Sequence, residues 1–70
     1  MIIFTDHALK RMRERKILRA QVIETVEHPE IEIVEDDDIK LLRKKFGNKS
    51  LEVAIESGKN KIIVITLYWL

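Results

Sequence analysis

The stretch TDHALKRMRERKILRAQVIETVEHP, residues 5–29, predicts two helices and decides the fold class. Thr5 or its neighbour Asp6 is a suitable N-cap for a first helix over residues 6–15. A second helix over about residues 19–27 ends before the proline that closes the stretch, because proline forces the preceding residue out of helical geometry. Apolar residues recur at helical spacing in both segments: Ala8, Leu9, Met12 and Ile17, then Val22, Ile23 and Val26.

The rest of the chain predicts strands separated by short turns. Alternating apolar and polar residues indicate strands over about residues 30–35, 39–46, 51–56 and 62–69. The last of these is apolar on both faces, which is typical of a central strand covered by helices. Met1–Phe4 adds a short strand or an anchoring arm. We therefore expect one α+β domain over residues 1–70, with two N-terminal helices packed on a four-stranded antiparallel sheet.

The composition excludes several classes of protein. There is no cysteine, so disulfides, thiolate metal sites and a cysteine nucleophile are excluded. Only two glycines occur, far apart, so a glycine-rich phosphate loop is absent and we expect no nucleotide cofactor. The two histidines lie far apart as well, and we expect no metal site. No apolar run is long enough to cross a membrane and no signal peptide precedes the first helix, which predicts a cytoplasmic protein.

Charge is unevenly distributed although the formal net charge is only +1. Residues 10–19 and 39–49 are rich in lysine and arginine, whereas residues 20–38 contain acidic residues and no lysine or arginine. Segregated charge of this kind produces either solvated faces that pair with each other or a surface that binds a polyanion. The charged fraction of 36% with few asparagines and glutamines is typical of heat-adapted proteins.

Three basic side chains form a stripe along the first helix, at spacing i, i+4, i+8: His7, Arg11 and Arg15. An imidazole moves protons at neutral pH, and arginines bind phosphate oxygens, so the set suits phosphodiester chemistry. The alternative is a histidine that caps the helix and two arginines paired with carboxylates.

Two further groups of side chains suit contacts to a polyanion. Arg43 and Lys45 share one face of the predicted strand 39–46, and they join the first-helix stripe if that strand faces the helix. The alternative is an edge strand kept soluble by its charges. Thr66 and Tyr68 share a face of the last strand, where a tyrosine stacks on a base, donates to a phosphate or completes the core. Trp69 is either a docking point or part of the core.

The segment Phe4–Ile17 resembles the H-A-x-x-R-M-x-x-R-x-I opening of the family known as domain of unknown function 4258. The later segments 22–30 and 64–68 fit the family's Val/Ile/Glu-rich helix before a proline and its V-x-T-x-Y strand. Lys16, Leu18 and His28 depart from the glycine, the Ser or Thr cap and the asparagine usual in the family. That family in turn resembles the RelE/ParE-like toxins of toxin–antitoxin pairs, which implies two helices on an antiparallel sheet.

The resemblance implies a small metal-independent endoribonuclease, the toxin of a type II pair, neutralised by a cognate antitoxin. Its catalytic residues would be His7, Arg11, Arg15 and Tyr68, and its RNA contacts Lys10, Arg43, Lys45 and Thr66. The RNA would be free or bound to a ribosome. The alternatives are a toxin that poisons its target by contact alone, as ParE-like proteins are thought to do, and a regulatory interaction module.

Overall fold

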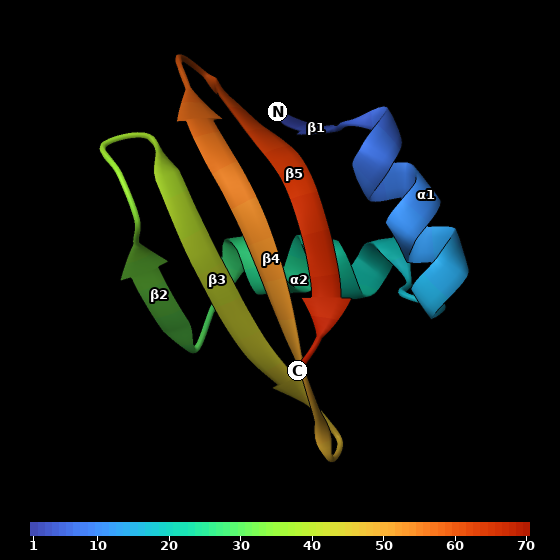
Figure 1. The fold of residues 1–70 in the computed structure, drawn as a ribbon. Coiled ribbons are helices and arrows are strands. Elements are labelled where there is room, and N and C mark those ends of the chain that lie inside the picture. Colours follow the sequence, from blue (N-terminus) through green and yellow to red (C-terminus); the bar gives the residue numbers. More distant parts are fainter.

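Five strands form one mixed sheet, and two helices pack against one face and one edge of it (Figure 1). The computed structural model describes residues 1–70 and contains, in chain order, β1 (Ile2–Phe4), α1 (Asp6–Arg15), α2 (Arg19–Glu27), β2 (Ile31–Val34), β3 (Ile39–Phe46), β4 (Lys49–Gly58) and β5 (Lys61–Trp69). The strand order is β1-β5-β4-β3-β2. The α+β class with two helices is confirmed. The sheet has five strands rather than four, because β1 joins it parallel to β5, while the other neighbours are antiparallel.

Local chemistry explains why both helices begin and end where the sequence predicts. Thr5 is the N-cap of α1, and its hydroxyl oxygen accepts a hydrogen bond from the Ala8 N–H at 3.0 Å. Lys16 ends α1 in the left-handed conformation, with φ 54° and ψ 47°, where glycine is usual. Leu18 offers no capping oxygen to α2, but the Gln21 side chain accepts from the Leu18 N–H at 2.9 Å.

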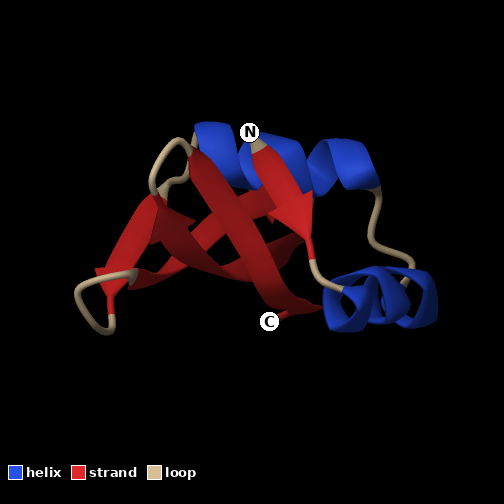
Figure 2. Cartoon of the chain, turned by 90° about the horizontal axis from the view of Figure 1, so that it is seen from above, coloured by secondary structure: helices blue, strands red, loops and turns tan.

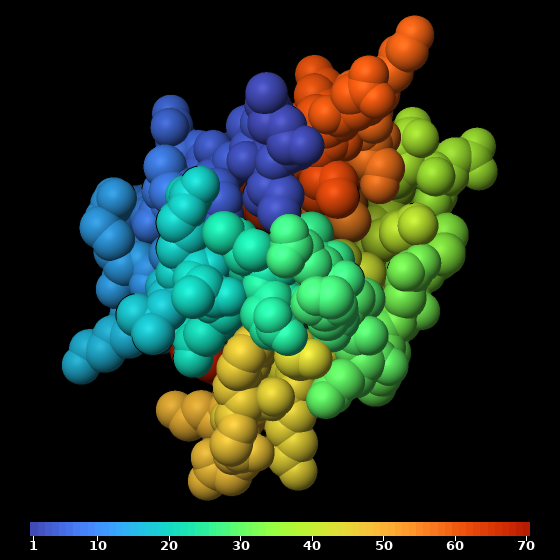
Figure 3. Space-filling model, turned by 180° about the vertical axis from the view of Figure 1, so that it is seen from behind, coloured from blue at the N-terminus to red at the C-terminus, as the bar shows by residue number.

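The core lies between α2 and one face of the sheet. Figure 2 shows α2 along this face, and Figure 3 shows it from behind, lying across the strands. The covered face supplies the largest share of the core, and the helices and the link between them supply the rest: Leu42, Leu51, Val53, Ile55, Val64 and Leu67 from strands, Ala8, Met12, Val22 and Val26 from helices, and Ile17 from the link. Burying a side chain of this size stabilises the fold by about 1.5–3 kcal/mol, so this layer holds α2 in place.

α1 lies along the edge of β5 and supplies donors to it. β1 covers this edge only at Ile62–Val64. Beyond that point the Thr5 hydroxyl donates to the carbonyl of Ile65 at 3.1 Å, and Nη1 of Arg15 donates to the carbonyl of Leu67 at 2.8 Å. The strand's exposed carbonyls are therefore satisfied by the helix and its cap instead of by another strand.

The opposite face of the sheet carries no helix, and we call it the open face (Figures 1 and 2). The prediction that the last strand is central and covered by helices is confirmed in part: β5 lies inside the sheet, between β1 and β4, but the core covers only one of its faces. Side-chain alternation and register place Ile3, Ile31, Arg43, Glu52, Thr66 and Tyr68 on the open face. Neither helix is long and apolar enough to cross a membrane.

Candidate functional site

A buried carboxylate occupies the centre of the open face. Glu52 on β4 is only 2% exposed, although it lies on the side of the sheet that no helix covers. Its direct neighbours in the register are Arg43 on β3 and Tyr68 on β5. Nε of Arg43 donates to one carboxylate oxygen at 2.5 Å, and the Tyr68 hydroxyl donates to the other. Three adjacent strands thus contribute one side chain each to a hydrogen-bonded row, Arg43–Glu52–Tyr68.

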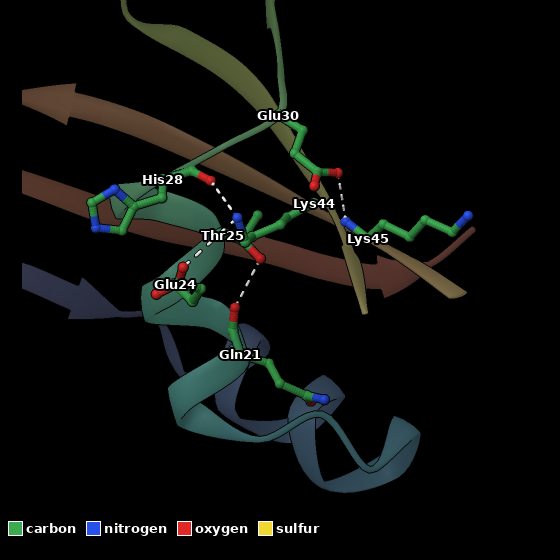
Figure 4. Close-up of polar contacts among 7 residues, drawn as sticks. All are labelled: Gln21, Glu24, Thr25, His28, Glu30, Lys44 and Lys45. Carbon is green, nitrogen blue, oxygen red and sulfur yellow. Dashed lines mark hydrogen bonds and ion pairs between the residues drawn. The ribbon is translucent and has the colours of Figure 1, made fainter. Parts of the chain in front are cut away.

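The basic residues of β3 divide between the two faces of the sheet, as alternation predicts. Lys44 turns toward α2, where its Nζ donates to the His28 carbonyl at 3.0 Å and lies 3.7 Å from a Glu24 carboxylate oxygen (Figure 4). The Lys45 backbone N–H donates to Glu30 at 3.0 Å, and its side chain extends away from this cluster. Lys44 therefore ties β3 to α2, whereas Arg43 and Lys45 are left to the open face.

The three motif residues of α1 differ in their contacts. His7 is exposed, and Arg11 pairs with Glu14 on the same helix at 2.7 Å. That pairing, led by the hydrogen bond from Arg11, holds the pKa of the Glu14 carboxyl below its ordinary value of 4.5. Arg15 donates to the Leu67 carbonyl, and the Trp69 indole donates to the carbonyl of Arg15 at 3.0 Å. In the alternative interpretation of this stripe, the cap by His7 is wrong, because Thr5 is the N-cap. The pairing of Arg11 with a carboxylate is confirmed by Glu14, whereas Arg15 bonds a backbone carbonyl instead.

Helix geometry places His7 and Arg11 beside the open face. Ala8 is buried, and a helix turning about 100° per residue sets Arg11 roughly 60° and His7 roughly 100° from it on one side, with Met12 and Leu9 on the other. α1 runs beside β5 in the same direction, with α2 behind the sheet (Figure 1). A right-handed helix in this orientation turns His7 and Arg11 toward the open face and Met12 toward α2. Arg11 and His7 thus border the half of the open face that carries Thr66 and Tyr68.

The two basic patches do not meet. The sheet order puts β4 and β5 between β3 and α1. Arg43 and Lys45 therefore lie on a strand about 10 Å from β5, and the α1 stripe lies beyond β5. Lys10 is exposed and falls further round α1 than Arg11. The site residues predicted from the sequence therefore form two groups: His7, Arg11, Thr66 and Tyr68 at one side of the open face, and Arg43 with Lys45 at the other.

Glu52 connects the two groups, and the sequence-based prediction missed it. Alternation predicts that Glu52 lies on the polar face of its strand, which is correct, but alternation does not predict that this side chain is buried. The cross-strand neighbours Arg43 and Tyr68 bury it instead, and they are determined by strand register. The carboxylates of residues 35–38, by contrast, are exposed in the turn before β3. No three His, Asp or Glu side chains lie together as a metal-binding group, and the surface contains no pocket.

Trp69 belongs to the edge of the core. Its ring meets Phe46 edge to face at a centroid distance of 6.5 Å, and both rings pack against the buried cluster. Lys49 lies over the outer side of the indole, 5.8 Å from the ring centroid. With its indole N–H bonded to α1, Trp69 links the end of β5 to the end of the first helix. This placement favours the core role for Trp69 over the docking role.

A family model described as a domain of unknown function, DUF4258, matches residues 4–69. The chain belongs to the DUF4258 family. The match runs from the last residue of β1 to the last residue of β5, so the whole α1 motif and the Arg43–Glu52–Tyr68 row lie inside the DUF4258 domain. Neither a curated protein nor a solved structure matches the chain.

Proposed function

We propose that this DUF4258 protein is the toxin of a type II toxin–antitoxin pair and cleaves RNA without a metal ion, in the cytoplasm. The observation that carries the proposal is the position of His7 and Arg11 at the border of an open sheet face that also presents Tyr68 and Arg43. A proton-transfer group and cations around an uncovered surface suit a single-stranded RNA laid across the strands. The two helices on a largely antiparallel sheet support the likeness to RelE/ParE-like toxins.

The proposed reaction is transfer of a phosphodiester within the RNA. The 2′-hydroxyl oxygen forms a bond to the adjacent phosphorus, and the bond from phosphorus to the 5′-oxygen breaks. His7 takes the proton of the 2′-hydroxyl or gives one to the leaving 5′-oxygen, and water exchanges the other proton. Arg11 stabilises charge that develops on the phosphate oxygens. The products are a 2′,3′-cyclic phosphate and a 5′-hydroxyl.

The other candidate site residues make contacts within the protein, and these contacts limit the role of each residue in the proposed reaction. Tyr68 commits its hydroxyl hydrogen to Glu52, so it supplies a ring at a fixed position for a base to stack on. Arg15 uses one N–H on the Leu67 carbonyl, so it holds α1 in place and adds positive charge. Lys10, Lys45 and Thr66 would contact the RNA backbone, with Lys45 the more distant from His7.

A second candidate function is a toxin that acts by binding a protein target without chemistry. The open face favours it, because apolar side chains are exposed at both of its edges: Ile31 on β2 at 51% and Ile3 on β1 at 38% exposure. A protein partner that spans the sheet would cover both. Both candidates include a cognate antitoxin, either an acidic, extended segment that would neutralise the basic side of α1 or an apolar helix that would pack near Trp69.

The test is cleavage of a mixed RNA substrate by the purified protein in EDTA, with and without ribosomes. His7→Ala and Arg11→Ala are compared with Arg13→Ala, a matched control on the exposed side of the same helix. We expect cyclic phosphate ends from the wild type and from Arg13→Ala, and at least about a hundredfold slower cleavage without His7. Absence of cleavage by the folded wild type under every condition would refute the ribonuclease and favour the binding toxin.

A further inference from the structure

The Arg43 guanidinium is anchored on one side and free on the other. Its Nε is bonded to the buried Glu52, whereas its two terminal nitrogens have no hydrogen-bond partner in the protein. The side chain remains 35% exposed. A guanidinium is planar, so fixing Nε also fixes the direction in which the pair of terminal N–H groups points. Arg43 thus presents a pre-oriented pair of donors on the open face.

Glu52 is well placed to hold this orientation. It lies on the middle strand β4 and is 2% exposed, and its second oxygen is occupied by the Tyr68 hydroxyl. Both carboxylate oxygens are therefore engaged, each by a neighbour on a different strand. The Glu52 side chain is held from two sides and has little conformational freedom. The position of the Arg43 guanidinium that it binds is therefore set by the strand pairing of the sheet.

We infer that the terminal N–H groups of Arg43 form a phosphate subsite for single-stranded RNA, and that Glu52 is the positioning residue of this subsite. Two parallel N–H donors match two phosphate oxygens, and an anchored arginine loses less side-chain entropy on binding than a free one. Ile31 lies directly opposite Arg43 in the register and is 51% exposed, which offers an apolar surface for the neighbouring base. The inference rests on the proposed function only in taking RNA as the ligand.

The sign of one substitution separates positioning from simple electrostatics. Glu52 carries a negative charge, so electrostatics alone predicts that its removal strengthens binding of a polyanion. Positioning predicts the opposite for Glu52→Ala, which leaves Arg43 without its anchor. Glu52→Gln keeps an acceptor for the Nε of Arg43 and should bind at least as well as wild type. Glu56→Ala, on the same face of the same strand and exposed, removes an equal charge without touching Arg43.

The experiment measures binding of a 2′-O-methyl oligonucleotide, which cannot be cleaved because it lacks the attacking hydroxyl. We expect Glu52→Ala to bind about three- to tenfold more weakly than Glu52→Gln, the size expected for one misdirected hydrogen-bonded contact. Arg43→Gln should reduce the slope of log affinity against log salt by about 0.7, the value for one phosphate on a single strand. Lys40→Gln on the other face of β3 is the matched control for loss of a cation.

Each outcome decides the inference. If Glu52→Ala binds as tightly as Glu52→Gln, or more tightly, the positioning role is wrong. If Glu52→Ala is unfolded by circular dichroism, Arg43→Lys replaces it: the charge remains but the paired donors and Nε are lost, and unchanged binding refutes the subsite. Binding that depends on Arg43 in a protein that cleaves nothing refutes the ribonuclease alone. A folded wild type that binds no oligonucleotide refutes both.

Discussion

Replacing Arg15 by alanine tests whether this motif residue stabilises the fold, apart from any part it has in cleavage. Its Nη1 donates to the Leu67 carbonyl at 2.8 Å, at a part of the β5 edge that no strand covers. Hydrogen bonds from charged donors contribute about 1.5–3 kcal/mol, and because Arg15 is largely exposed we expect about 1–2 kcal/mol here. For a domain of this size, that loss lowers Tm by about 4–16 °C.

Arg13→Ala is the matched control, because both arginines lie in the last turn of α1. Each loses the same favourable interaction with the helix C-terminus, about 0.3–1 kcal/mol, and both change helix propensity equally. Arg13 has no bonded partner on the sheet, and the Trp69 bond to the backbone carbonyl of Arg15 survives both changes. The difference between the two variants therefore measures the bond to Leu67.

The assay is urea unfolding followed by circular dichroism, with the midpoint compared at constant m. Equal midpoints for Arg15→Ala and Arg13→Ala would show that the bond to Leu67 contributes nothing, and the reasoning about the β5 edge would fail. Cleavage measured below both transitions then gives the remaining role of Arg15. Retained activity in folded Arg15→Ala would remove it from the catalytic set.

Three further changes test other parts of the structure. Thr5→Val should destabilise the fold by about 1–2 kcal/mol in urea unfolding, since the cap on Ala8 is lost, whereas Thr5→Ser should be nearly neutral. Lys16→Gly should raise Tm, because it relieves about 1–2 kcal/mol of strain in the left-handed backbone conformation. This gain outweighs the loss of about 0.4–1 kcal/mol that glycine causes by giving the unfolded chain more freedom. A lower Tm would show that Lys16 is not strained. Arg11→Ala should raise the pKa of Glu14 toward 4.5 in an NMR titration. Because that pKa is lowered in the folded protein, the stabilisation is present above 4.5 and is lost as pH falls through the lowered value. Arg11→Ala should reduce this acid dependence, while the charges of Lys10 and Arg15 keep part of it.

The helices were predictable because their boundaries depend on neighbours in sequence. Thr5 caps a donor three residues away, and Lys16 takes the conformation that the missing glycine would have taken. Each of these interactions spans fewer than about five residues, which is the range over which spacing rules operate. The strand boundaries of β3 were predicted for the same reason, since turns flank it.

The sheet order and the buried carboxylate depend on pairs far apart in the chain. Ile3 pairs with Ile63 in a parallel arrangement that no local pattern specifies. Glu52 is buried only because the register puts Arg43 and Tyr68 opposite it, and a shift of one residue would turn it to the covered face, away from both partners. Residues 62–69 are apolar on both faces because neighbouring strands and α1 pack around them. Periodicity alone does not distinguish this packing from burial beneath helices on both faces of the strand.

The attachment of α1 to β5 has a consequence for synthesis on the ribosome. The helix is made early, but the strand that receives its Thr5 and Arg15 donors follows more than fifty residues later, as the separations of 60 and 52 residues between bonded groups show. At a translation rate of about 5–20 residues per second, several seconds pass between the synthesis of α1 and the synthesis of the β5 edge that it binds. Because β1 also pairs with β5, this end of the sheet stays incomplete until then, whereas β2, β3 and β4 pair with one another without β5. A nascent chain therefore cannot assemble the surface that joins His7 to Tyr68 until β5 has emerged, which delays any activity of that surface to the end of the domain's translation.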